Sequence, residues 1–200
     1  MTRLSITIGE GELRLAVHRG LLRRFHKDPQ SLVIDELGIQ HGTSRVDIAV
    51  INGILHGFEI KSPIDSLDRL PKQVSSFCAV LDKMTLIAAE DHLERAMPLL
   101  PRWWGIIGVR IGPRGGITFC RVRRGKENRS VEPLALAQLL WRTEAQSILR
   151  ALGADKKILR LPRREMYSHL ATTLELDVLK RVVRGALKGR RNWRDLSPAL

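Results

Sequence analysis

One stretch of the sequence restricts the possible folds more than any other, and it spans residues 45–62. Two apolar runs are joined there by Asn52-Gly53, a dipeptide typical of tight turns between antiparallel strands. Because successive side chains of a strand alternate between the two faces of a sheet, Glu59 and Lys61 are expected on the same face. The stretch is therefore predicted to form a β-hairpin that carries charged side chains on one face.

The pairing of the two strands decides whether Asp47 joins Glu59 and Lys61. A two-residue turn would put Asp47 on the opposite face from Glu59 and would divide the apolar side chains between both faces. A three-residue loop with Gly53 in the left-handed conformation keeps the apolar side chains together and gathers the charged ones, because a one-residue slip exchanges the faces. Gly57 would then lie opposite Asp47 and leave space for a substrate or ion. The pairs that this loop predicts are Val50 with Ile54, Ile48 with His56 and Val46 with Phe58.

Two carboxylates and a lysine supply what the hydrolysis of a phosphodiester bond requires. The oxygens of Asp47 and Glu59 would bind Mg²⁺, or Mn²⁺ in its place, together with the backbone carbonyl of Ile60. Lys61 would lie beside the attacking water and neutralise charge that develops on the phosphate. The alternative is a surface ion pair between Glu59 and Lys61, worth roughly 0–1 kcal/mol. The neighbouring positions are almost wholly apolar, as in a covered sheet, and charges on a covered face usually mark a site.

The same residues resemble the motif of a known family. Asp47, a gap of eleven residues and then Glu59-Ile60-Lys61 are similar to the motif of the PD-(D/E)XK nuclease superfamily, which has the restriction-endonuclease-like fold. The resemblance extends over about the first two thirds of the chain. Val46 stands where the family name has proline. Phe77 stands where RecB-like members often have a tyrosine, so no hydroxyl contact is expected from that position.

Residues on either side of the hairpin add to the predicted site. Gln73, in the first turn of the next predicted helix, resembles the glutamine of RecB-like members, which implies a catalytic role in positioning water or phosphate. An exposed helix glutamine is the alternative. For Glu36 the resemblance implies an extra metal or water ligand, and a solvated carboxylate at a strand end is equally compatible. Arg69 is either a contact to phosphate or a surface charge.

The order of the predicted elements places the hairpin in an α/β fold. Apolar residues recur at helical spacing in three segments, and short apolar runs of strand length occur in four others. The helices are predicted at residues 10–25, 71–81 and 91–100, and the additional strands at residues 31–37, 84–89, 104–111 and 117–122. Strands that alternate with helices favour a central mixed β-sheet flanked by helices, which is also what the resemblance implies.

The last third of the chain is predicted to be a small basic helical extension. The polar stretch 126–132 separates a nuclease-like core, residues 1–130, from residues 131–200, where leucines recur at helical spacing. Its helices are predicted at residues 133–152, 163–174 and 175–187. Residues 190–200 are predicted to end in a weakly fixed tail.

The distribution of charge indicates the kind of partner. The formal net charge is +13, and residues 150–200 contain 13 Lys and Arg against 5 Asp and Glu, which gives +8. Such an excess favours a polyanion, most simply nucleic acid, with DNA favoured over RNA. The alternative is a solvated helical surface or a membrane-surface patch, although the scarcity of aromatic residues there argues against membrane insertion. The contacts predicted in the extension are Lys180, Arg181, Arg184 and Lys188, and Arg121, Arg123 and Arg124 are the alternative set.

These observations together predict a nuclease that depends on Mg²⁺ and hydrolyses phosphodiester bonds in nucleic acid. The alternative is a catalytically inactive nucleic-acid-binding protein with the same fold. A third interpretation, an interaction protein whose basic tail binds acidic partners, leaves Asp47, Glu59 and Lys61 unexplained. No Gly-rich phosphate loop, zinc-ligand spacing or Ser/His/Asp order indicates another class of enzyme. No run approaches the ~20 apolar residues of a membrane span, and residues 1–12 lack the apolar core of a signal peptide. The protein is therefore expected in the cytoplasm.

Overall fold

A six-stranded mixed sheet forms the centre of the computed structural model, which describes residues 8–190. The strands are β1 Leu32–Ile39, β2 Ser44–Asn52, β3 Ile54–Lys61, β4 Lys83–Ala89, β5 Gly105–Ile111 and β6 Ile117–Arg123. They lie side by side in chain order. Neighbours are antiparallel from β1 to β3 and from β5 to β6, and parallel from β3 to β5. The predicted α/β class with a mixed sheet is confirmed.

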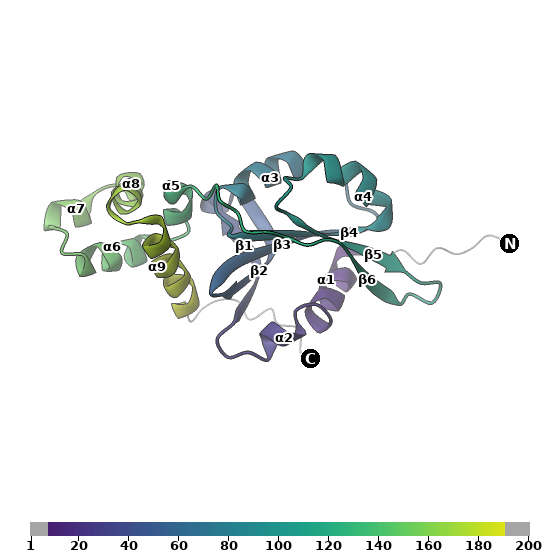
Figure 1. Cartoon of the computed structure of the whole chain (residues 1–200). Coiled ribbons are helices and arrows are strands. Elements are labelled where there is room, and N and C mark those ends of the chain that lie inside the picture. Colours follow the sequence, from purple (N-terminus) through teal and green to yellow (C-terminus); the bar gives the residue numbers. More distant parts are fainter. Residues whose placement is uncertain (1–7, 191–200) are drawn as a thin grey trace.

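Helices cover both faces of this sheet (Figure 1). The helices of the core are α1 Glu10–Arg19, α2 Arg23–His26, α3 Leu70–Cys78, α4 Glu90–Ala96 and the short 3-10 helices η1 Gln40–Gly42 and η2 Met97–Leu99. The C-terminal helices are α5 Pro133–Ala137, α6 Arg142–Ala151, α7 Lys156–Arg160, α8 Arg163–Thr173 and α9 Leu176–Gly189. Helices α3 and α4 lie on one face and α1 and α2 on the other, while the C-terminal helices gather at one side of the molecule.

Two of the predicted helices are divided in the structure. The first ends at Gly20, and α2 begins three residues later. The helix predicted after the polar stretch is interrupted between α5 and α6, where the Trp141 N–H donates to the Glu144 carboxylate and begins a new helix. Helix α7 was not predicted, and it begins where Asp155 accepts hydrogen bonds from two backbone N–H groups.

Within residues 8–190, no helix has both the length and the apolar character that crossing a membrane requires. The predicted tail lies, apart from Arg190, outside the described residues.

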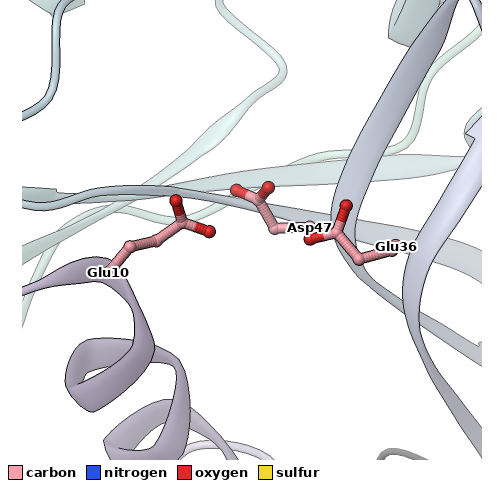
Figure 2. A group of neighbouring side chains, drawn as sticks. All are labelled: Glu10, Glu36 and Asp47. Carbon is pink, nitrogen blue, oxygen red and sulfur yellow. The ribbon is translucent and has the colours of Figure 1, made fainter.

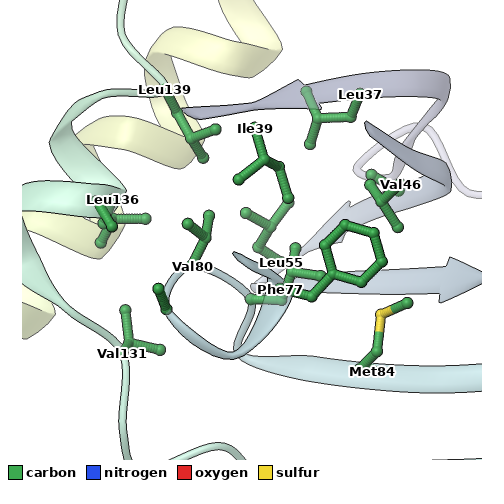
Figure 3. Packing of buried hydrophobic residues seen from close by; sticks show 14 of the residues in the cluster. Leu37, Ile39, Val46, Leu55, Phe77, Val80, Met84, Val131, Leu136 and Leu139 are labelled. Atoms are coloured by element: carbon green, nitrogen blue, oxygen red, sulfur yellow. The ribbon is translucent and has the colours of Figure 1, made fainter. Parts of the chain in front are cut away.

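The sheet separates two apolar clusters. The smaller one packs between α1 and the sheet and contains Leu13 and Ile48. The larger one lies on the α3 side and includes Leu55, Phe77 and Leu136 (Figure 3). Because Leu136 belongs to the C-terminal helices, this cluster continues from the predicted core into the predicted extension. The predicted core and the predicted extension therefore share one hydrophobic core.

The hairpin has the predicted face pattern near its turn but a different register. The observed pairs are Ile51 with Leu55, Val50 with His56 and Ile48 with Phe58. The predicted pairs, Val50 with Ile54, Ile48 with His56 and Val46 with Phe58, are wrong by two residues. The observed register buries Ile51 completely and leaves Ile54, which is 41% exposed, beside the turn. Gly53 has the predicted left-handed conformation, with φ +67°. A shift of two residues preserves the faces of Ile48, Val50 and Phe58, because side chains alternate with period two. Val46, predicted on the same face, lies instead in the larger cluster on the α3 side.

A buried carboxylate attaches the last helix to the sheet. Asp82, just before β4, accepts the Leu55 N–H at 2.8 Å, the Lys180 Nζ at 2.8 Å and the Arg184 Nη1 at 3.2 Å. The Asp82 side chain is 5% exposed and that of Lys180 is 11% exposed. Since Lys180 and Arg184 both come from α9, this contact fixes the C-terminal helix against the start of β4.

We expect Asp82→Ala to lower the free energy of unfolding by about 3–5 kcal/mol, because it leaves a buried ammonium group and a backbone N–H without a partner. Urea denaturation measures this loss. The matched control is Glu90→Ala, which breaks the exposed pair with Arg110 and should have a much smaller effect. Equal losses in the two variants would contradict the structural role of Asp82.

Candidate active site

The hydrogen-bonded ladder between β2 and β3 ends where the predicted charged residues begin. The last pair is Ile48 with Phe58, whereas β2 remains paired with β1 as far as Ser44. Beyond that pair, Oδ2 of Asp47 accepts a hydrogen bond of 2.6 Å from the Ile60 N–H. A side-chain oxygen therefore takes the place of a backbone partner. The hydrogen bond from the Ile60 N–H holds the Asp47 carboxylate beside β3.

Glu36 on β1 has a backbone conformation that is rare for its residue type. Its φ of +56° lies in the left-handed region, which residues other than glycine seldom occupy. The usual alternation is lost there, so Ile34 and Leu37 both contribute to the same apolar cluster. The Glu36 carboxylate is 34% exposed and lies close to that of Asp47. Strained backbone of this kind is concentrated at functional sites in proteins.

A third carboxylate comes from the start of α1. Ligand oxygens of Glu10, Glu36 and Asp47 all lie within 4.8 Å of one another (Figure 2). The Arg14 Nη2 contacts Glu10 and Glu36 at 2.5 Å each and lies 3.7 Å from Asp47 Oδ1. Burial opposes the charge of Arg14, but its hydrogen bonds with Glu10 and Glu36 raise its pKa above the usual value. Arg14 is therefore the central cation of this acidic cluster, and the more exposed Arg45 lies 3.5 Å from Glu36.

Glu59 is held from two directions and is almost completely buried. Its Oε1 accepts hydrogen bonds from Lys61 Nζ at 2.8 Å and from Gln73 Nε2 at 2.5 Å. Glu59 is 1% exposed and Lys61 is 4% exposed. The other oxygen, Oε2 of Glu59, and Oε1 of Gln73 are buried and have no hydrogen-bond partner within the described part of the chain. Both atoms therefore have unused capacity to interact with a ligand.

The two central carboxyl groups influence each other. Burial and then the nearby Glu59 charge raise the pKa of Asp47 to about 8, although the Ile60 N–H and Arg14 act in the opposite direction. Burial also raises the pKa of Glu59, against the effects of Lys61 and Gln73. Ionisation of either carboxyl group is therefore unfavourable in the folded protein, and a cation bound beside them would make it more favourable.

One pocket of about 400 Å³ brings the predicted catalytic and metal-binding residues together. Its lining includes Glu36, Asp47, Glu59, Ile60, Lys61, Gln73 and Arg69, together with Glu10. Glu10 and Arg14 were missed as site residues, because their approach to β1 and β2 depends on how α1 packs. The predicted space at Gly57 is absent. Gly57 pairs with Ala49, and a Cβ on it would lie 2.6 Å from Leu81 in the core.

The four basic residues predicted on α9 do not line this pocket. Lys180 and Arg184 are paired with Asp82, and Lys188 Nζ donates to the Gln30 carbonyl at 2.5 Å. Arg181 is exposed, and no hydrogen bond or ion pair engages its side chain within the described residues. The binding of nucleic acid by this helix stays a prediction, but two of its four cations already serve the fold.

Comparison with known proteins gives one family, one protein that is similar in sequence and one similar solved structure. The profile of the family described as "Bacteriophage P4 protein cII" matches residues 6–196. Protein cII of Enterobacteria phage P4 is 23% identical over 181 residues, which are 90% of this chain and 67% of that protein. A solved structure of a protein of unknown function from Silicibacter pomeroyi is 19% identical, with a TM-score of 0.43, over 73% of this chain and 92% of that one.

The raised pKa of Asp47 gives a prediction about stability. Between pH 4 and pH 8 the unfolded chain loses the Asp47 proton while the folded protein keeps it, so folding stability falls as the pH rises. Asp47→Asn keeps an oxygen for the Ile60 N–H and has no such proton. We expect this variant to be more stable than the parent near pH 8, on the order of a few kcal/mol, and the gain to disappear near pH 4.

Urea denaturation in EDTA at several pH values measures this difference. The matched control is Glu94→Gln on the exposed side of α4, where the side chain makes no described contact. Its difference from the parent should not change with pH in this range. A pH-independent difference for Asp47→Asn would show that Asp47 ionises normally.

Proposed function

The chain belongs to the bacteriophage P4 protein cII family, and we propose that it is a metal-dependent nuclease that hydrolyses phosphodiester bonds in nucleic acid, with DNA as the favoured substrate. The observation that carries the proposal is the buried Glu59. Its Oε2 has no described partner, and it shares one pocket with Asp47, Lys61 and Gln73. A structural carboxylate would be expected to have both oxygens satisfied.

The residues present fit a hard divalent cation. Magnesium and calcium prefer carboxylate and carbonyl oxygens at about 2.0–2.6 Å, so oxygens on opposite sides of one ion lie about 4–5 Å apart. Glu10, Glu36 and Asp47 satisfy this spacing, whereas Glu59 lies outside that group and offers its unpaired Oε2 in the same pocket. Mg²⁺ or Mn²⁺ bound there would supply positive charge to the phosphate and acidify a water molecule. The predicted ligands Asp47, Glu59, Glu36 and the Ile60 carbonyl are retained in the proposal, and Glu10 is added.

The chain's own groups would position the water and the phosphate. Lys61 is fixed by Glu59 at the pocket wall, where its ammonium group can donate to a phosphate oxygen as negative charge develops. Oε1 of Gln73 has no described partner and can accept a hydrogen bond from the attacking water. Arg14 Nη2 lies among the Glu10, Glu36 and Asp47 oxygens in the structure, so it would move aside when an ion binds there. Arg69 at the rim of the pocket can contact a neighbouring phosphate.

A second candidate is a nucleic-acid-binding protein of the same fold that does not cleave its ligand. The observation in its favour is Arg14, which neutralises Glu10 and Glu36 directly and so provides the acidic cluster with a cation from the chain itself. Both candidate functions involve binding to nucleic acid, and only the nuclease cleaves it. For both we propose the cytoplasm as the place of action and a division into a nuclease-like core, residues 1–130, and a basic extension, residues 131–200.

We expect Asp47→Ala and Glu59→Ala each to abolish cleavage that depends on Mg²⁺ or Mn²⁺, because each removes a ligand oxygen from the pocket. The measurement is degradation of labelled single-stranded and duplex DNA and RNA with and without the metal. Glu94→Gln is the control for the loss of an acidic side chain and should cleave like the parent. Unchanged cleavage by both alanine variants would refute the proposal, as would a parent that cleaves none of the substrates.

Lys61→Ala should lower the single-turnover rate by about 10²–10³-fold and change affinity little, because its contact strengthens as charge builds on the phosphate. Rates are measured in Mg²⁺ and affinities in Ca²⁺, which suppresses cleavage. Lys157→Ala removes an exposed lysine of α7 and serves as the matched control. A loss of affinity as large as the loss of rate would mean that Lys61 only binds the substrate.

A further inference from the structure

A second pocket lies on the α1 and α2 side of the sheet, and its lining is basic. Its volume is about 490 Å³, and it shares no lining residue with the candidate active site. It lies between the end of α1, α2 and the beginnings of β3, β4 and β5. The residues that line it are Leu21, Arg24, Phe25, His56, Phe58, Lys83, Thr85, Gly105, Ile107, Arg121, Arg123, Arg124 and Gly125.

Five of these residues are cations, and none is an acid. Lys83, Arg121 and Arg124 make no described hydrogen bond or ion pair through their side chains, so their charges are not neutralised within residues 8–190. Arg123 is fixed by hydrogen bonds to the carbonyls of Trp104 at 2.7 Å and Pro101 at 3.0 Å. The carbonyl contacts fix its guanidinium group without removing its charge. The pocket therefore combines one immobilised cation with several free ones.

The floor of the pocket is neutral and aromatic. The His56 ring lies 4.1 Å from that of Phe58, centroid to centroid, and its Nε2 is 2.9 Å from the Thr85 hydroxyl. Burial and then the charges of Lys83 and Arg24 lower the pKa of His56 to about 3. The ring is thus uncharged at neutral pH. The charges of Lys83 and Arg24 beside the ring also give the cavity a positive potential, which would attract an anion.

We propose that this pocket binds the phosphate of a nucleotide unit, with the cations around the phosphate and the apolar and aromatic residues against the sugar or base. A nucleotide needs cations for its phosphate and an apolar or aromatic surface for its base. Free arginine and lysine side chains beside aromatic rings provide both. The volume lies within the range of sites for small molecules. The proposal does not rest on the nuclease assignment, because the two pockets share no lining residue and this one needs no metal.

The nucleotide unit has two possible sources with the same chemistry. It is either a free nucleotide or one residue of a nucleic-acid strand that crosses this face of the molecule. A free nucleotide would bind with one site per chain. A strand would bind with an affinity that falls with salt, by about 0.7–0.9 in log affinity per log salt for every phosphate contact.

The test compares the parent with Arg121→Ala/Arg124→Ala, using ATP in calorimetry and a labelled oligothymidylate in fluorescence anisotropy, both in EDTA. Arg129→Ala/Arg160→Ala removes the same charge from exposed positions outside the pocket and is the matched control. We expect the pocket variant to weaken binding of at least one probe about tenfold or more, and the control to weaken it less than about twofold. Lys83→Ala should also weaken binding, from the β4 side of the pocket.

Binding of ATP that is lost only in the pocket variants assigns a nucleotide site. If the pocket variant loses binding only to the oligonucleotide, and its affinity depends less on salt than that of the parent, the pocket is a strand-binding site. Equal weakening by the pocket variant and the control would overturn the proposal, because binding would then depend on the net positive charge of the protein and not on this pocket. Failure of the parent to bind either probe would also overturn it. Cleavage assays in Mg²⁺ test the nuclease proposal separately.

Discussion

Two buried carboxyl groups in one pocket, Asp47 and Glu59, are the constraint on which the rest of the site depends. Burial disfavours both charges, and each charge disfavours the other. The chain offsets this penalty with the Ile60 N–H, Lys61 and Gln73 around the two groups and with Arg14 beside Asp47. These compensating groups come from β3, α3 and α1. The site therefore exists only when both helices are packed on opposite sides of the same pair of strands.

The same requirement explains the irregular backbone beside the pocket. Glu36, Gln40 and His41 all have positive φ although none is glycine. Such conformations persist only where surrounding contacts fix them. A chain of hydrogen bonds from Ser44 through Ser76 to Gln40 ties this segment to α3, and the His41 ring stacks on Tyr167 of α8 at 5.9 Å. The C-terminal helices thus support the rim of the site by packing, in addition to any role of their charges.

The sequence allowed the sheet and the central motif to be predicted because both follow from local alternation. Glu59 and Lys61 are two apart on a strand, which puts them on one face. The parity predicted for Asp47 is not what brings it to them, because the alternation of β2 is lost beside it: Val46 and Ile48 lie in different apolar clusters, and Asp47 reaches β3 through its hydrogen bond with the Ile60 N–H. The exact register could not be obtained in this way, since shifts of two residues keep the same faces. Glu10 and Arg14 were missed because nothing in the helical pattern of α1 shows where its N-terminal end meets the sheet.

The basic helices show a second limit of sequence reasoning. Lys180 and Arg184 look like surface charges within α9, and only the folded chain brings them to Asp82, about one hundred residues earlier. A count of charge along the sequence cannot separate cations that stabilise the fold from cations that are free to bind a partner. Within residues 8–190, cations without a described partner occur at the end of β6 and at the start of β4 as well as at Arg181 on α9.

This distribution of charge has a consequence for the proposed function. A polyanion is attracted by a protein of net charge +13, but the carboxyl groups that line the candidate active site repel it wherever they are ionised, beside the cations Arg45, Lys61, Arg69 and Lys72 of the same lining. A divalent cation held by those carboxylates removes that repulsion, so the cation and the nucleic acid should each increase the affinity for the other. Such coupling is reciprocal and independent of turnover. The coupling arises because carboxyl groups and cations are separated on one small protein. The basic pocket lies on the α1 and α2 side of the sheet, and the carboxyl groups of the candidate active site lie at the opening between β2 and β3.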